Sequence, residues 1–114
     1  MVSRYGAKKD ANHGEIVDFL VRTATPHFDT SPLGCGFPDL IVCVRGVVEL
    51  WEIKNPKNSY GRKGLNKNQQ AFVTGWPGGP VVIIRSVDEA LARLNGKSGG
   101  GVLVAGPGLT GGLA

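Results

Sequence analysis

The sequence predicts an α/β domain in which a mixed β-sheet is flanked by helices. Apolar residues recur at helical spacing near the start of the chain, and short β-branched runs such as 40–44 and 81–84 alternate with helical patterns further on. A chain of 114 residues can bury one modest core. We therefore expect a single domain over residues 1–96, followed by a Gly-rich flexible tail over residues 97–114.

The expected elements follow the order α-β-β-β-α-β-α. They are a helix over 11–23, strands over 27–31, 40–44 and 47–53, a helix that begins after Asn66, a strand over 81–84 and a helix over 87–95. Pro26 ends the first helix, and Gly75 ends the second. Ser86 followed by Glu89 is typical of the capping box that begins a helix.

Charge, hydropathy and cysteine content indicate which partners and which cellular location to expect. The net charge is +4, which is a mild basic excess. No apolar run approaches the ~20 residues that span a bilayer, and residues 1–10 lack the apolar stretch of a signal peptide. We expect no membrane partner and a cytoplasmic location. Cys35 and Cys43 are expected to be reduced thiols; a zinc site that they form with His13 and His27 is the weaker alternative.

Two acids and a lysine are predicted to meet on one β-hairpin. If the turn is centred on residues 45 and 46, antiparallel pairing places Asp39 opposite Glu52. Lys54 lies two residues beyond Glu52, so both side chains share one face of the strand. The alternative is that Asp39 is a turn residue and that Glu52 and Lys54 are a solvated pair on an edge strand.

This set of side chains fits the hydrolysis of a phosphodiester. Such a reaction needs a nucleophilic water, neutralisation of charge at phosphorus and a stabilised leaving oxygen. Mg²⁺ or Mn²⁺ held by one or two carboxylates supplies much of this. We expect Asp39, Glu52 and the backbone carbonyl of Ile53 to bind the metal. Lys54 would orient or help to deprotonate the water, or stabilise charge at phosphorus.

Three segments together resemble a known family. They are Gly36-Phe37-Pro38-Asp39-Leu40, Glu52-Ile53-Lys54, and Leu65-Asn66-Lys67-Asn68-Gln69-Gln70-Ala71-Phe72. The set resembles the VRR-NUC family of the PD-(D/E)XK, or restriction-endonuclease-like, nucleases, in its compact stand-alone phage or bacterial type. The likeness spans about residues 12–95 and implies a restriction-endonuclease-like core of order α-β-β-β-α-β.

The resemblance implies two further site residues, one on each of two helices. Glu15 occupies the place of an acid on the first helix that would bind the metal; the alternative is a solvent-facing glutamate. Gln69 occupies the place of a glutamine that steers water or phosphate, with Gln70 as the competing assignment and a helix surface position as the alternative for both. The chain departs from the family in Phe72, where Trp is usual, and in Asn66, where Ser or Thr is usual.

A basic stretch next to this site predicts contact with nucleic acid. It contains Lys57, Arg62, Lys63 and Lys67, and no acid follows Glu52 in it. Such a stretch would hold phosphates without reading bases, so we expect structure-selective binding. The alternative is a solvated, mobile loop. The resemblance implies a homodimer that acts on branched DNA such as Holliday junctions.

The sequence therefore predicts a metal-dependent endodeoxyribonuclease. One alternative is a non-catalytic nucleic-acid-binding module that keeps the nuclease fold. Another is a small structural or assembly protein with a basic loop, which would bind no metal.

Overall fold

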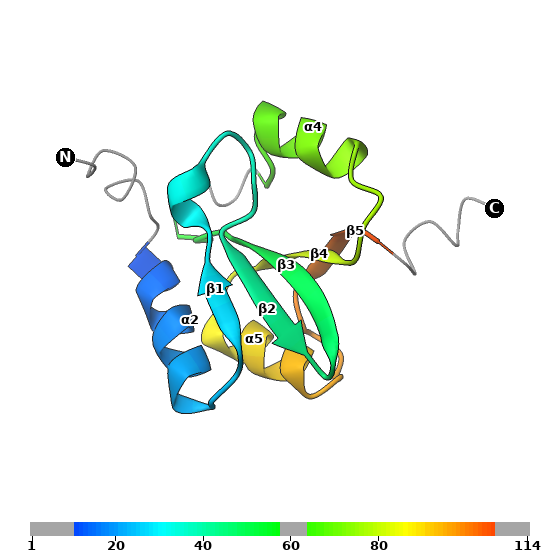
Figure 1. Cartoon of the computed structure of the whole chain (residues 1–114). Helices are drawn as coiled ribbons and strands as arrows, with labels where there is room; N and C mark the ends of the chain where they lie inside the picture. Colours follow the sequence, from blue (N-terminus) through cyan, green and yellow to red (C-terminus); the bar gives the residue numbers. More distant parts are fainter. Residues whose placement is uncertain (1–10, 58–63, 107–114) are drawn as a thin grey trace.

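A mixed β-sheet with helices on both faces organises the chain (Figure 1). The computed structural model describes residues 11–57 and 64–106. The strands are β1 His27–Asp29, β2 Leu40–Val44, β3 Val47–Ile53, β4 Val81–Ile84 and β5 Val102–Ala105. The helices are α2 Ala11–Arg22, α4 Lys67–Thr74 and α5 Val87–Leu94, with a 3-10 turn, η1, at Ser31–Leu33. The strand order is β1-β2-β3-β4-β5; β3 and β4 are parallel, and the other neighbours are antiparallel.

The predicted α/β class is confirmed, and so are most of the predicted elements. β2, β3 and β4 have the expected bounds, and α2 and α5 each end one residue earlier than expected. β1 is shorter than the predicted strand over 27–31. It ends at Asp29 because η1 begins at Ser31, with Pro32 in its first turn.

The prediction that residues 97–114 form a flexible tail is wrong for residues 102–105. These residues form β5, which pairs with β4 and closes that side of the sheet. Glycine directly before the strand makes the pairing possible. A Cβ at Gly101, whose φ is +84°, would collide with the carbonyl oxygen of Ile83. Gly101, one of the glycines that suggested flexibility, instead allows a close approach of the two backbones. Residues 107–114 lie outside the described residues.

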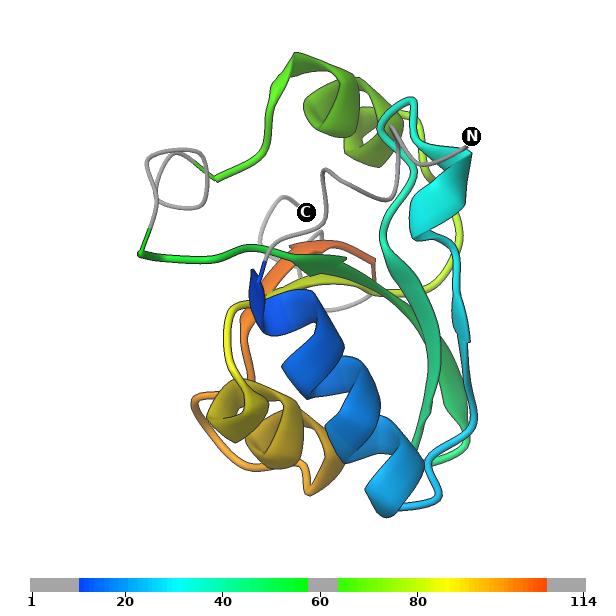
Figure 2. The ribbon, with the colours of Figure 1, turned by 90° about the vertical axis from the view of Figure 1, so that its left-hand side faces the viewer.

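The two faces of the sheet carry separate apolar clusters. α2 and α5 cover one face and α4 covers the other (Figure 2). The larger cluster joins α2 and α5 to the sheet, and its member Trp51 is fully buried. The smaller one packs Phe37, Phe72 and Trp76 against Leu50. Alternation along β3 therefore directs Trp51 toward α2 and α5, and Glu52 toward the face that α4 covers.

A buried ion pair fastens α5 to β3. Arg93 donates from Nε to Oε1 of Glu49 at 2.9 Å and from Nη2 to Oε2 at 2.8 Å. Trp51 Nε1 donates to the same Oε1 at 3.1 Å. A carboxylate that is 4% exposed needs such partners, because an unpaired buried charge is costly. None of the described helices has both the length and the apolar character needed to cross a membrane.

Candidate functional site

The β2–β3 hairpin has the register that was predicted from its turn. Arg45 and Gly46 both have positive φ, as a tight two-residue hairpin turn of type I′ requires. Leu40 pairs with Trp51 at the open end of the hairpin. Asp39 lies one residue before β2, and extending the register by one position brings it level with Glu52. The prediction that Asp39 and Glu52 face one another is confirmed.

Backbone hydrogen bonds hold the Pro38–Asp39 segment in place. The N–H of Ile53 donates to Oδ2 of Asp39 at 2.8 Å, so the carboxyl group caps the end of β3. On the other side, the N–H of Thr30 donates to the carbonyl of Asp39 at 2.8 Å, and its hydroxyl donates to the carbonyl of Pro38 at 2.7 Å. Thr30 is buried. Sequence reasoning missed it, because a threonine before a Ser-Pro turn carries no distinctive signal.

Gln69 bridges the glutamate and the lysine of β3. Lys54 Nζ donates to Gln69 Oε1 at 2.8 Å, and Gln69 Nε2 donates to Glu52 Oε2 at 2.7 Å. Glu52 is 4% exposed and Lys54 is 7% exposed, so the alternative of a solvated pair on an edge strand is wrong. Gln70, the competing assignment, is exposed and donates to the carbonyl of Leu65 instead.

Local contacts of α4 fix the position of Gln69. Asn66 begins the helix with a capping box: the N–H of Gln69 donates to Asn66 Oδ1, and the N–H of Asn66 donates to Gln69 Oε1, each at 2.9 Å. Gly36 lies against the same turn, where a Cβ would come within 2.5 Å of the carbonyl oxygen of Asn68. Glycine at this position therefore lets α4 approach the loop that precedes Asp39.

Burial raises the pKa of the Asp39 carboxyl above its ordinary value. The hydrogen bond from Ile53 and a side-chain hydrogen bond with Glu52 act in the opposite direction without cancelling the effect of burial. The charges of His13 and Lys54 also act to lower it. A hydrogen bond between two carboxyl groups requires a proton on one of them. Burial therefore makes the Asp39 carboxyl retain a proton more readily than a free aspartate does.

A second carboxylate, Asp29, pairs with a histidine of α2. His13 Nε2 lies 3.1 Å from Asp29 Oδ2, and His13 is 4% exposed. Ser31 donates to Asp29 Oδ1 from its N–H at 2.9 Å and from its hydroxyl at 2.6 Å. Burial raises the pKa of Asp29, but the bonds from Ser31 and from His13 outweigh burial and hold it below the ordinary range. Sequence reasoning had considered His13 only as a zinc ligand.

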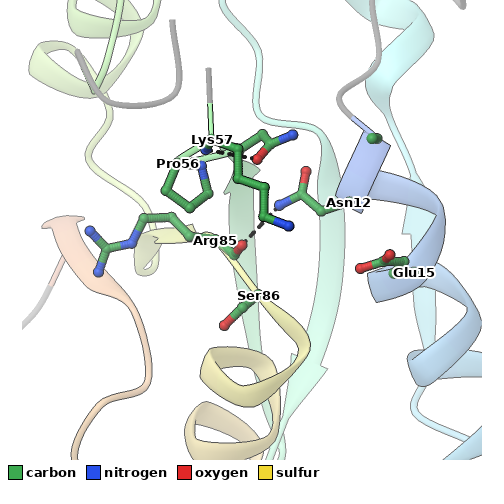
Figure 3. A pocket seen from close by; sticks show the side chains of 8 residues that line it. Asn12, Glu15, Pro56, Lys57, Arg85 and Ser86 are labelled. Carbon is green, nitrogen blue, oxygen red and sulfur yellow. Dashed lines mark hydrogen bonds between the residues drawn. The ribbon is translucent and has the colours of Figure 1, made fainter. Parts of the chain in front are cut away.

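Glu15 does not join Asp39 and Glu52 in the structure. Glu15 is exposed and lines a cavity of about 290 Å³ between the start of α2 and the start of α5. Lys57, Arg85 and Ser86 line the same cavity (Figure 3). The guanidinium of Arg85 points away from Asn12 and pairs with Glu89 of α5, Nη2 to Oε2, at 2.7 Å.

Two of the four predicted phosphate-binding side chains, Lys57 and Lys67, lie within the described residues. Lys57 lines the cavity, and Lys67 is exposed at the first position of α4. Arg62 and Lys63 lie outside the described residues.

The acid pair suits a hard divalent cation. The facing oxygens of Asp39 and Glu52 are the ligands that Mg²⁺ and Mn²⁺ prefer, and a cation between them would relieve the cost of burying two acids. Mg²⁺ needs only one or two protein carboxylates when a phosphate supplies further oxygens. Within residues 11–57 and 64–106, no three His, Cys, Asp or Glu side chains gather closely enough to hold a metal ion. Cys35 and Cys43 are free thiols.

Comparison of the chain with protein-family models, with curated proteins and with solved structures finds no match in any of the three.

Proposed function

We propose that this protein is a metal-dependent nuclease that hydrolyses the phosphodiester bonds of DNA, with a restriction-endonuclease-like core. One observation carries the proposal: Asp39 and Glu52 face one another at the end of a hairpin, and Gln69 links Glu52 to the buried Lys54. A scaffold has no need to bury a lysine and two acids together, because unpaired burial of charge is costly. The resemblance to the VRR-NUC family supports the same reading.

The reaction would proceed by attack of water on phosphorus. A new P–O bond forms and the bond from phosphorus to the leaving sugar oxygen breaks. The attacking water loses a proton to the solvent, and the leaving sugar oxygen takes one up from the solvent. Asp39 and Glu52 would hold a divalent ion, which would make a water more acidic and neutralise charge on the phosphate. Lys54 donates hydrogen bonds to the water or to a phosphate oxygen as negative charge builds up. Gln69 holds the Lys54 ammonium and the Glu52 carboxylate in fixed orientations.

The substrate class follows from the basic side chains and from the resemblance. Lys57 and Lys67 both follow Glu52 along the chain and would contact backbone phosphates without reading bases. We therefore propose structure-selective cleavage of branched DNA by a homodimer.

A cleavage assay tests the proposal. The protein is incubated with labelled junction, flapped, single-stranded and linear duplex DNA, with Mg²⁺, Mn²⁺ or a chelator. We expect cleavage that requires the ion and is faster on junctions than on linear duplex. Lys54→Met should lower the rate by about 100-fold or more, which is the scale of losing one charge-stabilising group. Arg22→Met, at the exposed far end of α2, is the matched control and should cleave normally.

Three results would contradict parts of the proposal. Cleavage that survives Lys54→Met at the control rate would remove the proposed site. Equal rates on linear duplex and junction would remove the structure selectivity. Tight binding of junction DNA without ion-dependent cleavage would favour the non-catalytic binding module instead.

A further inference from the structure

The first turn of α2 carries two adjacent polar side chains, Asn12 and His13, that contact different parts of the sheet. We call Asp39, Glu52 and Lys54 the acid–lysine site. One contact reaches Lys54 directly, and the other reaches a residue next to Thr30, which holds the Asp39 backbone. Since α2 packs on the opposite face of the sheet from α4, the site is held from both faces (Figure 2).

The Asn12 contact fixes the backbone of Lys54. Asn12 Nδ2 donates to the carbonyl of Lys54 and to the carbonyl of Arg85, each at 2.9 Å. Only the amino group can donate to two carbonyls, so this geometry fixes the orientation of the amide. Asn12 Oδ1 is buried and has no hydrogen-bond partner among the described residues. The amide therefore holds the ends of β3 and β4 together, although the unsatisfied buried oxygen lowers the stability of the folded chain.

The His13 contact leads to Asp39 through the end of β1. The ionised carboxylate of Asp29 can only accept, so the proton between it and His13 lies on Nε2. The residue after Asp29 is Thr30, whose N–H and hydroxyl hold the carbonyls of Asp39 and Pro38. His13 is also close enough for its charge to act on the Asp39 carboxyl. His13 therefore supports Asp39 indirectly, through Asp29 and the neighbouring Thr30.

Glu15 lies apart from this arrangement. It is exposed on the side of the cavity opposite Lys57 (Figure 3), and the acid pair is not among the residues that line the cavity with it.

We propose that α2 serves the nuclease site through Asn12 and His13 as positioning residues, which hold Lys54 and Asp39 respectively, rather than through Glu15. This inference rests on the proposed function. It assigns to the first turn of α2 the task of keeping the acid pair and the lysine in register, so that a metal ion and a phosphate meet preset groups.

Metal binding and kinetics of the full chain test the inference. Mn²⁺ affinity is measured by calorimetry, and kcat and KM are measured on junction DNA, at a temperature at which each variant is folded by circular dichroism. His13→Leu removes the contact with Asp29. We expect Mn²⁺ affinity or kcat to fall by about 10- to 100-fold, which is the scale for residues that support metal ligands, with little change in KM. His13→Gln retains an N–H donor and should restore most of the loss.

Matched variants separate positioning from general stability. His27→Leu alters the histidine at the other end of β1. Among the described residues, the imidazole of His27 makes a hydrogen bond only with the Thr25 carbonyl, so this variant should lower stability without changing Mn²⁺ affinity or kcat. Asn12→Asp replaces the donor to two carbonyls by an acceptor and should lower kcat. Glu15→Gln should lower affinity and kcat less than His13→Leu does. If His13→Leu does not fold, Asp29→Asn, which keeps the shape and removes the charge, should lower Mn²⁺ affinity.

The outcomes distinguish the inference from the function. Wild-type cleavage together with control-like behaviour of the His13 and Asn12 variants overturns the inference and leaves the nuclease intact. A larger loss in Glu15→Gln than in His13→Leu also overturns it. A wild-type protein that neither binds Mn²⁺ nor cleaves overturns the proposed function, and the inference with it.

Discussion

Replacing Asp39 by asparagine should make the protein more stable at neutral pH while abolishing any metal-dependent activity. In the folded chain, Asp39 accepts from the N–H of Ile53 and meets a second carboxyl group, that of Glu52, in a hydrogen bond that requires a shared proton. In Asp39→Asn, the amide oxygen can still accept from Ile53. The amide nitrogen then donates permanently to Glu52, so no proton has to be retained.

The size of the gain follows from the hydrogen bond and from burial. A hydrogen bond to a charged group contributes about 1.5–3 kcal/mol, and side-chain ordering offsets a part of it. We expect the free energy of unfolding to rise by about 1–2 kcal/mol at pH 8 without metal. In a domain of this size that corresponds to a rise in Tm of roughly 5–15 °C.

The pH dependence of unfolding shows whether the gain in stability of Asp39→Asn comes from the raised pKa of Asp39. The folded-state pKa of Asp39 is raised, so its favourable contribution is complete below the ordinary value of 3.8 and is lost as pH rises through the folded-state pKa. Asp29 has the opposite sign: its pKa is lowered, so its contribution is lost only as pH falls below the ordinary value. The advantage of Asp39→Asn over the wild type should therefore grow as pH rises from about 4 to 8.

Thermal and denaturant unfolding, followed by circular dichroism in the presence of a chelator, measure this advantage. Asp18→Asn changes an exposed acid of α2 and is the matched control; its stability should equal that of the wild type at each pH. Saturating Mn²⁺ should raise the Tm of the wild type and leave Asp39→Asn unchanged. A variant that is no more stable than the wild type at pH 8 would refute the reasoning.

Three further changes test the supports of the site. Gln69→Leu leaves a buried ammonium and a buried carboxylate without their bridge, and should lower the free energy of unfolding by about 2–4 kcal/mol in denaturant titration and reduce cleavage. Gly36→Ala combines a φ of +87° with a collision against the backbone of Asn68; it should cost about 2 kcal/mol or more and lower cleavage. Arg93→Leu leaves the buried Glu49 carboxylate without an opposite charge, at a cost of about 3–5 kcal/mol, and Glu49→Leu in the same chain should recover much of this cost without affecting the cleavage chemistry.

Local patterns predicted the parts of the fold that depend on neighbouring residues. The turn Arg45-Gly46 sets the hairpin register through its backbone geometry, and strand alternation then sets which side chains share a face. Both are short-range rules, so Asp39 and Glu52 could be paired from sequence. The capping box of α4 is equally local, although the bridge from Gln69 to β3 had to come from the resemblance.

The parts that sequence did not predict depend on how distant elements approach one another. Asn12 and His13 contact strands that follow them by many residues, and no spacing rule identifies such partners. β5 was not predicted because a glycine in the sequence can indicate either a flexible chain or a place where two backbones pack closely. At Gly101 the second meaning applies, and only the neighbouring strand reveals it.

β5 also bears on how the chain can be shortened. A truncation after residue 96, where the patterned part of the sequence ends, would remove Val102–Ala105 and uncover the outer side of β4. That strand is Val81-Val82-Ile83-Ile84, with every residue buried, so its unpaired backbone would be exposed along an apolar edge. Edges of this kind recruit strands from other molecules. A version cut at residue 96 should therefore aggregate and express poorly, whereas in the chain that retains β5 this edge of β4 stays paired.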